Sequence, residues 1–213
     1  MPASYDPTIA LIVVDVQNDF ADPEGGLSVR GGGDVVPLIN KEIEAARAAG
    51  ATVIFTQDWH PASTPHFAKD GGTWPVHCVA GSWGADLPPG LDALEADPRV
   101  RKGSDGEDGY SGFTMRDPAT GATTPTDLDG LLTRSGITRT RIAGLATDYC
   151  VRATALDSVA LGYLTDVLVD AIRAGDLVPG DGGRALDEMR AAGVTMVVSQ
   201  AASTPGVPTE GGA

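Results

Sequence analysis

The regular alternation of short apolar runs with single helical patterns most strongly constrains the fold of this chain. The predicted strands cover residues 9–16, 51–57, 100–102, 139–145, 164–171 and 194–199, and the predicted helices cover residues 35–49, 127–134, 148–161 and 183–192. Strands that are joined by single helices pair in parallel, with helices on both faces of the sheet. The order therefore predicts an α/β fold of three layers, α/β/α and Rossmann-like, around a six-stranded, mainly parallel sheet.

Two long stretches, residues 58–98 and 103–125, interrupt this alternation. Both are far longer than ordinary connections in a compact domain, and such loops usually carry function. With 213 residues, of which 42% are hydrophobic, the chain suits one domain with a sizeable core. We assign that domain to residues 1–200. Residues 201–213 are rich in Ser, Thr, Pro and Gly and are predicted to form a disordered tail.

The composition argues against several classes of partner. A net charge of -14 opposes binding to nucleic acid or to an anionic membrane surface, and no run of apolar residues is long enough to span a bilayer. The first residues lack the basic region of a secretory signal, and two cysteines are too few for a disulfide framework. We therefore expect a cytoplasmic protein with free thiols. The sequence leaves open whether Cys78 pairs with Cys150 and whether the protein is a homo-oligomer.

All three histidines, His60, His66 and His77, lie in the first long stretch. Histidines that serve packing alone would be expected to scatter over the chain. Asp58 and His60 follow the predicted strand 51–57, and open α/β sheets bind their ligands at this end of the strands. Because imidazole and carboxylate are the usual ligands of zinc, iron and manganese, the pattern predicts a metal site beside an active site.

Three further polar residues, Asp15, Lys102 and Cys150, lie at the ends of predicted strands, and these ends share one edge of a parallel sheet. A carboxylate in an apolar strand is costly unless it is paired, and Lys102 can pair with Asp15. A structural ion pair explains those two residues equally well. Cys150 lies where a strand gives way to a helix, whose dipole lowers a thiol pKa and whose free N–H groups can bind an oxyanion. A lone cysteine is more often inert, but the combination of nucleophile, acid/base group and cation favours catalysis.

Four separated motifs carry a resemblance to a known family. They are ALIVVDVQNDF at residues 10–20, TQDWH at residues 56–60, WPVHC at residues 74–78 and GLATDYCVRAT at residues 144–154. Together they resemble the nicotinamidases (pyrazinamidases) of the isochorismatase-like, or cysteine hydrolase, superfamily, over residues 8–200. The first and last motifs mark the superfamily broadly. The middle two contain the histidines and are more specific to the nicotinamidase branch.

The resemblance implies catalytic roles for the residues at the strand ends. Cys150 corresponds to the nucleophile, Asp15 to the proton acceptor and donor, and Lys102 to the cation that orients Asp15 and favours the thiolate. It also implies a cis peptide bond before Ala146, so that the N–H groups of Ala146 and Cys150 form the oxyanion hole. The adjoining pair Asp148 and Arg152 is predicted to interact at i, i+4 spacing on the helix and receives no catalytic role.

The resemblance also implies a metal and a substrate pocket. Asp58, His60 and His77 would hold one divalent metal ion, with zinc favoured and iron(II) or manganese(II) left open. His66 matches a position that supplies a ligand in some members of the family and not in others. The residues implied for the aromatic pocket are Phe20, Trp74 and Tyr110, joined by Tyr149 beside the nucleophile.

The implied reaction converts nicotinamide to nicotinate and ammonia through a thioester on Cys150, with the metal orienting the pyridine ring. It would serve NAD salvage, with pyrazinamide as a further substrate. One alternative is a sister amidase acting on carbamoyl or ureido compounds, which has no use for the histidine cluster. Another is a non-catalytic binding protein with a structural metal, although structural zinc sites are usually closed and rich in thiolates. The isochorismate-cleaving branch fits least, because its chemistry does not use the cysteine.

Overall fold

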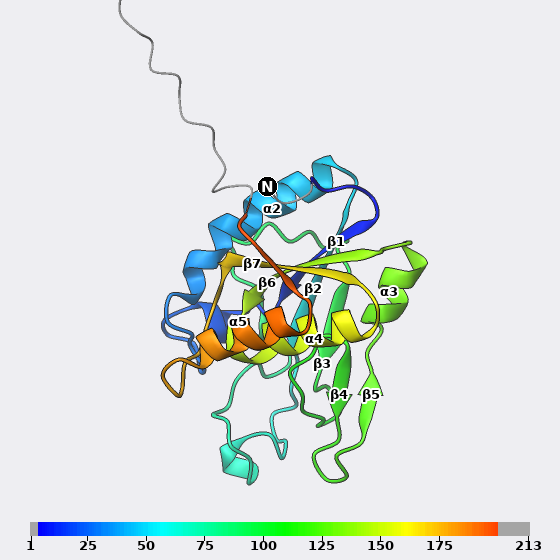
Figure 1. Cartoon of the computed structure of the whole chain (residues 1–213). Coiled ribbons are helices and arrows are strands. Elements are labelled where there is room, and N and C mark those ends of the chain that lie inside the picture. Colours follow the sequence, from blue (N-terminus) through cyan, green and yellow to red (C-terminus); the bar gives the residue numbers. More distant parts are fainter. Residues whose placement is uncertain (1–3, 200–213) are drawn as a thin grey trace, which may run out of the picture.

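The computed structural model describes residues 4–199 and contains the predicted central sheet. Its strands are β1 (Ile9–Val14), β2 (Thr52–Asp58), β3 (Arg99–Lys102), β6 (Arg139–Leu145), β7 (Leu164–Arg173) and β8 (Thr195–Val197), in the order β3-β2-β1-β6-β7-β8 (Figure 1). Every neighbouring pair is parallel. The six-stranded parallel sheet predicted from the sequence is therefore confirmed.

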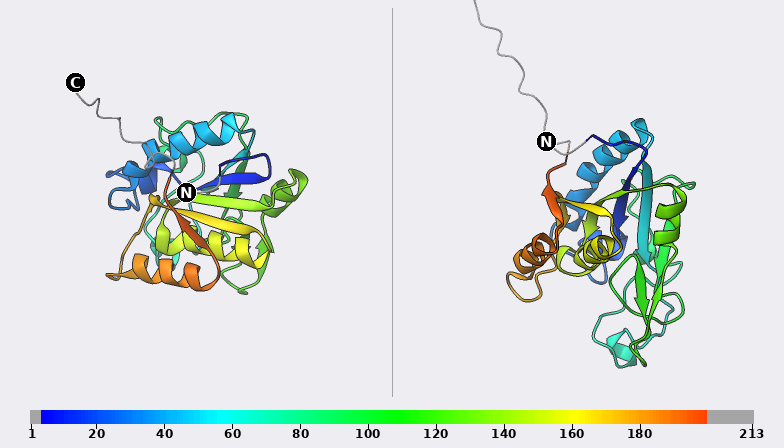
Figure 2. Two further views of the ribbon diagram at one scale, coloured as in Figure 1. Left: turned by 45° about the horizontal axis from the view of Figure 1, so that its top comes forward. Right: turned by 45° about the vertical axis from the view of Figure 1, so that its right-hand side comes forward.

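Helices cover both faces of this sheet. The α-helices are α1 (Asn18–Ala21), α2 (Val36–Ala48), α3 (Leu128–Arg134), α4 (Arg152–Ala160) and α5 (Asp181–Ala191). The short helices are η1 (Gly32–Val35), η2 (Ala68–Asp70), η3 (Trp83–Ala85) and the π-helix η4 (Thr147–Val151). Figure 2 shows α2 on one side of the sheet and α4 with α5 on the other, so the molecule has the three expected layers.

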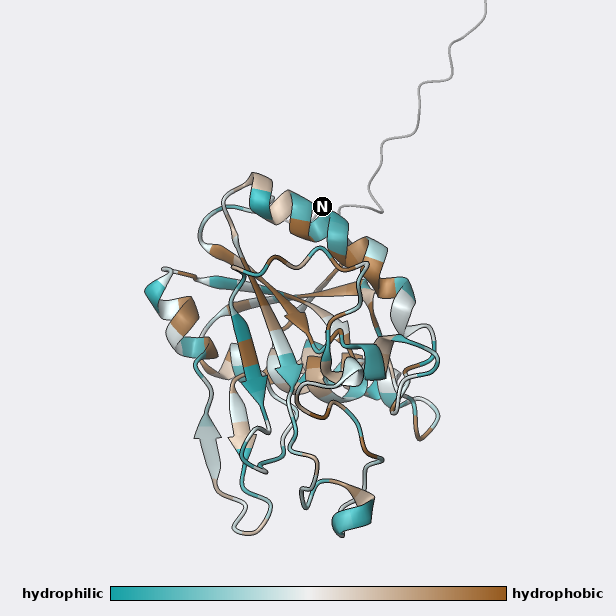
Figure 3. Ribbon diagram, turned by 180° about the vertical axis from the view of Figure 1, so that it is seen from behind, coloured by the Kyte–Doolittle hydropathy of each residue, from teal (hydrophilic) through white to brown (hydrophobic). Residues whose placement is uncertain are grey.

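The alternation of side chains along β1 builds a separate core on each face. Leu11 and Val13 belong to the core that includes buried residues of α2, whereas Ile12 and Val14 belong to the core that includes α3, α4 and α5. Successive side chains of a strand point to opposite faces, so a strand buried on both faces must be apolar throughout. Figure 3 shows hydrophobic residues in the inner strands of the sheet and hydrophilic residues alternating with hydrophobic ones along the helices.

One pair of strands is missing from the sequence-based prediction. β4 (Thr114–Arg116) and β5 (Thr123–Pro125) form an antiparallel hairpin within the second long stretch. Each is three residues long, and neither contains a buried residue. Without a buried face these strands have no hydrophobic alternation, which is the signal that predicts a strand.

The termini add little to this description. Residues 201–213, predicted to be a tail, lie outside the described residues, and the division into a domain of residues 1–200 and a tail stays a prediction. Within residues 4–199, no helix is both long and apolar enough to cross a membrane.

Candidate active site and metal centre

The carboxyl edge of the sheet brings four polar side chains together. Asp15 directly follows β1, Asp58 and Lys102 are the last residues of β2 and β3, and Cys150 lies in η4 after β6. Their strands are neighbours in the sheet, and all four side chains are buried. One carboxylate oxygen of each aspartate and the Sγ atom of Cys150 lie within 4.8 Å of one another. We call these four residues the carboxyl-edge cluster.

Lys102 is the cation of the carboxyl-edge cluster. Its Nζ atom lies 2.9 Å from Oδ2 of Asp15, donates a hydrogen bond to Oδ1 of Asp58, and lies 3.7 Å from Sγ of Cys150. The other oxygen of Asp15 accepts a hydrogen bond of 2.5 Å from the hydroxyl of Thr56. The backbone of Asp15 has a φ of 46°, a left-handed conformation that is uncommon outside glycine. Both oxygens of this carboxylate are therefore held in place beside the thiol.

Burial and charge shift the proton affinities of the carboxyl-edge cluster in different directions. Burial raises the pKa of Asp15, an effect that Lys102 opposes and Asp58 reinforces. Burial alone would also raise the pKa of Asp58, but Lys102 and two neighbouring histidines lower it to about 2. Burial would lower the pKa of Lys102, yet the surrounding anionic groups raise it well above its usual value. Asp58 and Lys102 are therefore both charged near neutral pH.

The pKa of Cys150 differs from the sequence-based expectation. Burial raises the pKa of this thiol well above its usual value, and the charge of Lys102 offsets only part of the effect. The helix dipole and a nearby cation were expected to favour the thiolate, but the loss of hydration outweighs them. The side chain of Cys150 is therefore a protonated thiol, and a base must remove its proton to activate it. Asp15 is the carboxylate available for that step.

The backbone before Cys150 contains the implied cis peptide bond, between Leu145 and Ala146. The turn that follows is the π-helix η4, in which the N–H groups of Tyr149 and Val151 both donate to the carbonyl of Ala146. π-Helical turns are rare and occur frequently at functional sites. The oxyanion hole formed by the N–H groups of Ala146 and Cys150 stays a prediction.

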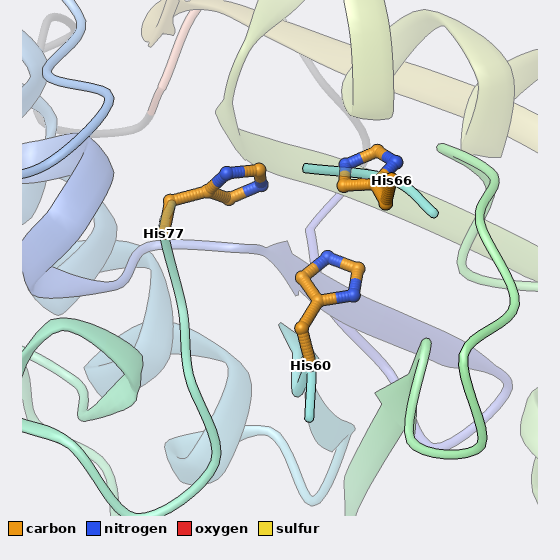
Figure 4. A group of neighbouring side chains, drawn as sticks. All are labelled: His60, His66 and His77. Atoms are coloured by element: carbon orange, nitrogen blue, oxygen red, sulfur yellow. The ribbon is translucent and has the colours of Figure 1, made fainter. Parts of the chain in front are cut away.

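The three histidines converge beside the carboxyl-edge cluster. One ring nitrogen of each of His60, His66 and His77 lies within 4.8 Å of the others, and Figure 4 shows the rings pointing toward one another from separate segments. The Oδ2 atom of Asp58 lies 3.9 Å from Nε2 of His60 and 3.8 Å from Nε2 of His77. The structure thus brings all four predicted metal-site residues together, His66 included.

The chemistry of these side chains fits a divalent metal. Neither ring nitrogen of His60 has a hydrogen-bond partner among residues 4–199, although both are buried. The Nδ1 atom of His77 lies 2.7 Å from the carbonyl oxygen of Pro75, and donation to it leaves Nε2 with a free lone pair. Burial lowers the pKa of His60 to about 4 and also lowers that of His66. Both are therefore neutral near pH 7, as metal ligands must be.

A pocket of about 620 Å³, partly open to solvent, adjoins both groups of residues. Its lining residues are Phe20, Leu27, Ser28, Val29, Asp58, His66, Trp74, His77, Gly109, Tyr110, Ala146, Tyr149, Cys150, Gly175 and Leu177. All four aromatic residues implied for the substrate pocket are among them. The ring of Tyr149 lies 5.2 Å from that of Trp74 and 5.3 Å from that of Tyr110, both edge to face. The indole N–H of Trp74 donates to the hydroxyl of Tyr110 at 3.2 Å.

Two supporting residues were missed in the sequence. Thr56 holds Asp15, and Gln17 holds Asp58 by two hydrogen bonds: its amide nitrogen donates to the carbonyl of Asp58 at 2.7 Å, and its amide oxygen accepts from the N–H of Asp58 at 2.8 Å. Thr56 and Gln17 lie inside the sequence motifs at residues 56–60 and 10–20. Their partners are 41 residues away, so no local pattern indicates them.

The predicted pair between Asp148 and Arg152 is wrong. Arg152 interacts instead with Glu188 on α5, at 3.1 Å. Asp148 accepts hydrogen bonds from the backbone N–H groups of Gly175 and Asp176. Two backbone donors satisfy a buried carboxylate, whereas a single pair with an exposed arginine is weak.

The two cysteines are both free thiols. Cys78 packs into the core on the α2 side of the sheet, and Cys150 belongs to the core on the opposite side. The N–H of Cys78 donates to Oδ2 of Asp19 at 2.6 Å. Cys78 is therefore a fully buried residue of the core.

Known proteins resemble this chain over most of its length. The model described as "Isochorismatase domain" matches residues 9–201 of this chain. The nicotinamidase of Escherichia coli is 37% identical over 206 residues, which cover 89% of this chain and 94% of the relative. A ureidoacrylate amidohydrolase of Methylobacterium radiotolerans is less similar, at 34% identity over 80% of this chain and 69% of its own length.

Two solved structures share the fold over nearly their whole length. The pyrazinamidase of Pyrococcus horikoshii, in complex with zinc, is 39% identical with a TM-score of 0.80 and covers 90% of this chain and 99% of its own. PnC1 from L. infantum, in complex with nicotinate, is 34% identical with a TM-score of 0.83 and covers 94% of this chain and 98% of its own.

Proposed function

Because the chain belongs to the isochorismatase family, we propose that it is a nicotinamidase, which hydrolyses nicotinamide to nicotinate and ammonia. One observation carries this proposal: the same aromatic pocket is lined by Cys150 and by three of the predicted metal-site residues, Asp58, His66 and His77. An amide is a poor electrophile. A site that fixes the ring at one end and presents the nucleophile at the other supplies the positioning that such a substrate requires.

The first step is binding of the substrate ring. Trp74, Tyr110 and Tyr149 are arranged edge to face, and they offer apolar walls to a flat heteroaromatic ring. Asp58, His60 and His77, with His66 beside them, would hold the metal, for which zinc is favoured by the zinc complex of the P. horikoshii relative. When bound, that metal would supply a Lewis acid that takes the ring nitrogen and so aims the carboxamide at Cys150.

The second step is attack by the thiol. Asp15 removes the proton from Sγ of Cys150, and the sulfur attacks the carboxamide carbon. The raised pKa of Asp15 makes it a stronger base than an ordinary carboxylate. The Nζ atom of Lys102, 3.7 Å from Sγ, stabilises the negative charge that develops on sulfur. The N–H groups of Ala146 and Cys150 would donate hydrogen bonds to the carbonyl oxygen as negative charge develops on it.

The third step releases ammonia and then nicotinate. Asp15 returns its proton to the amide nitrogen as the carbon–nitrogen bond breaks, which leaves a thioester on Cys150. Water then attacks the thioester while Asp15 accepts one of its protons, and that proton restores the thiol as nicotinate leaves. One carboxylate thus serves both half-reactions, for which its fixed position between Thr56 and Lys102 is suited.

We further propose that pyrazinamide is a substrate, since its ring carries a nitrogen at the same position relative to the carboxamide. We assign the enzyme to NAD salvage in the cytoplasm, where its free thiols would stay reduced. A sister amidase for ureido compounds is the runner-up, but it leaves the histidine cluster without a role.

The test is release of ammonia and nicotinate from nicotinamide by the metal-loaded protein, compared with Cys150→Ala and with Cys78→Ala as the matched cysteine control. Metal content is measured on all three. We expect turnover to vanish in Cys150→Ala while metal stays bound, and to persist in Cys78→Ala. If the metal-loaded wild type released no ammonia from nicotinamide, the proposal would fail and ureido substrates would be tried next.

A further inference from the structure

Asp148 holds a loop that the proposed reaction does not explain. The residue lies in η4, two positions before Cys150, and is buried. Its Oδ1 atom accepts the backbone N–H of Gly175 at 2.8 Å, and its Oδ2 atom accepts that of Asp176 at 2.8 Å. Those two residues are consecutive in the loop between β7 and α5. Each carboxylate oxygen therefore takes one backbone donor, and the loop is held at two adjacent points.

The held loop forms part of the substrate pocket. Gly175 and Leu177 line the pocket together with Tyr149 and Cys150 of η4. The side chain of Leu177 is also 63% exposed, so it lies at the mouth of the pocket. The wall is therefore built from an exposed loop, and the carboxylate of Asp148 ties that loop to η4.

A second contact fixes the far side of the same loop. Asp176 has a left-handed backbone, with a φ of 48°, and its Oδ1 atom accepts the N–H of Gly182 in α5 at 2.8 Å. Asp148 and Asp176 thus link η4, the loop and α5 in series. The nearby pair of Arg152 and Glu188 instead joins α4 to α5, at 3.1 Å.

We propose that Asp148 is a positioning residue, which sets the distance between Cys150 and the pocket wall formed by Gly175 and Leu177. By fixing this distance, Asp148 limits the size of the substrate ring that the pocket admits. The proposal rests on the nicotinamidase function for the identity of the substrate. A carboxylate suits this task because it offers two acceptors to two donors, which an amide side chain cannot do. Since η4 also carries the nucleophile, a shift of the loop changes how the substrate ring is held without removing a reacting group.

The decisive variant is Asp148→Asn in the metal-loaded enzyme. Asparagine keeps the shape of aspartate but presents an NH₂ group to one backbone N–H, so one of the two hydrogen bonds is lost. We expect KM for nicotinamide to rise about fivefold or more while kcat changes less than about twofold. We also expect kcat/KM for quinoline-3-carboxamide, a benzo-fused nicotinamide, to rise relative to that for nicotinamide. Glu188→Gln is the matched control and should alter neither quantity.

Hydrogen exchange at the backbone amides of Gly175 and Asp176 reports on the same contact without turnover. We expect exchange at these amides to become about tenfold faster or more in Asp148→Asn and to stay unchanged in Glu188→Gln. Unchanged exchange would overturn the proposal, whatever the activity. An inactive wild type with faster exchange in the variant would instead contradict the nicotinamidase function and leave the contact supported.

Other outcomes also decide the matter. A fall in kcat at unchanged KM would mean that Asp148 acts on Cys150 and not on the wall, and an unchanged preference between the two amides would mean that the wall does not limit ring size. If Asp148→Asn fails to fold, Leu177→Ala serves instead, because this exposed side chain can be shortened without opening the core. It should raise the relative kcat/KM for quinoline-3-carboxamide, and no change in that ratio would overturn the proposal.

Discussion

The sheet carries two buried groups of charged residues, one at each end of its strands, and only one has the features of an active site. The carboxyl-edge cluster consists of Asp15, Asp58, Lys102 and Cys150. At the opposite end, an amino-edge cluster consists of Tyr5, Glu42, Arg139, Arg141 and Asp166. The side chains of Glu42 and Arg141 are fully buried, as is that of Asp15. Burial of charge is therefore common to both ends and does not by itself distinguish function from structure.

Within the amino-edge cluster, each polar group is paired with another. The hydroxyl of Tyr5 donates to Glu42 at 2.7 Å, and Asp166 contacts Arg139 at 2.7 Å and Arg141 at 3.4 Å. The guanidinium of Arg141 also lies 4.3 Å from the centre of the Tyr5 ring. These contacts tie α2, β6 and β7 together, as expected of a structural network.

The two clusters differ in what surrounds them. Asp58 and Cys150 line the 620 Å³ pocket, which contains no residue of the amino-edge cluster in its lining. The carboxyl-edge cluster also adjoins histidine nitrogens that have no hydrogen-bond partner among the described residues, and it contains a nucleophile. A pocket, a reactive atom and available ligand atoms, added to buried charge, separate the cluster with the proposed catalytic role from the structural one.

The sharpest test of this comparison removes a charge from the carboxyl-edge cluster. Asp15→Asn should lower kcat for nicotinamide by a factor of about 10²–10⁴, because the only acid/base group of the proposed mechanism is lost. Its thermal midpoint should stay near that of the wild type, since Lys102 keeps Asp58 as its anionic partner and a neutral amide is easier to bury than a carboxylate. Steady-state kinetics and thermal unfolding of the same preparation check both statements. Near-normal kcat in a folded protein would remove Asp15 from the mechanism.

The matching change in the amino-edge cluster should have the opposite effect. Arg141→Met removes the positive charge that lies 3.9 Å from Glu42 and 3.4 Å from Asp166, and breaking a buried pair in this way costs about 3–5 kcal/mol of unfolding free energy. The kcat of the folded fraction should stay within about twofold of the wild type. Urea unfolding and kinetics at low temperature measure the two quantities. A large loss of kcat at unchanged stability would show that the two clusters are coupled.

Removal of the metal should abolish the activity and leave the protein folded. Chelation should abolish turnover, and addition of zinc should restore it. At a free zinc concentration 100 times the Kd, binding to the folded state adds about 2.7 kcal/mol of stability, so the thermal midpoint should rise on reloading. Full activity in a sample shown to be free of metal would contradict the assignment of the histidine cluster.

The smallest effect is expected for the hydroxyl of Tyr5. Tyr5→Phe removes one hydrogen bond to a buried carboxylate, which is worth about 1.5–3 kcal/mol. Turnover should not change, because Tyr5 lies at the other end of the sheet from Cys150. Denaturant titration gives the loss of stability, and an unchanged unfolding midpoint would mean that Glu42 finds another donor.

Much of the fold follows from the sequence because the strands are buried on both faces. The strand predicted at residues 139–145 has the bounds of β6. Parallel pairing then places the residues that follow the strands on one edge, which is why Asp15, Lys102 and Cys150 could be expected to meet. The hairpin of β4 and β5 could not, because it buries no face of its own.

The rest of the site depends on contacts that leave no local pattern. Gln17 and Thr56 act through single side-chain hydrogen bonds across 41 residues, and the partners of Asp148 lie 27 and 28 residues away. The pKa of Cys150 depends on how deeply the folded chain buries it, which the sequence does not report. The chemical type of each site residue can thus be predicted from the sequence, whereas its burial and its hydrogen-bond partners require the structure.

The hairpin of β4 and β5, which the sequence does not predict, is also a place where the chain could be cut into two fragments. Its turn reaches Gly121, whose φ is 73° and beside which no atom would meet an added Cβ within 4 Å. A chain cut there would leave Asp15 and Lys102 on one fragment and Cys150 on the other, with β1 and β6 to be paired between them. Turnover would then require both fragments to associate through that strand pair. Fused to two other proteins, the fragments would report the interaction of those proteins as release of ammonia.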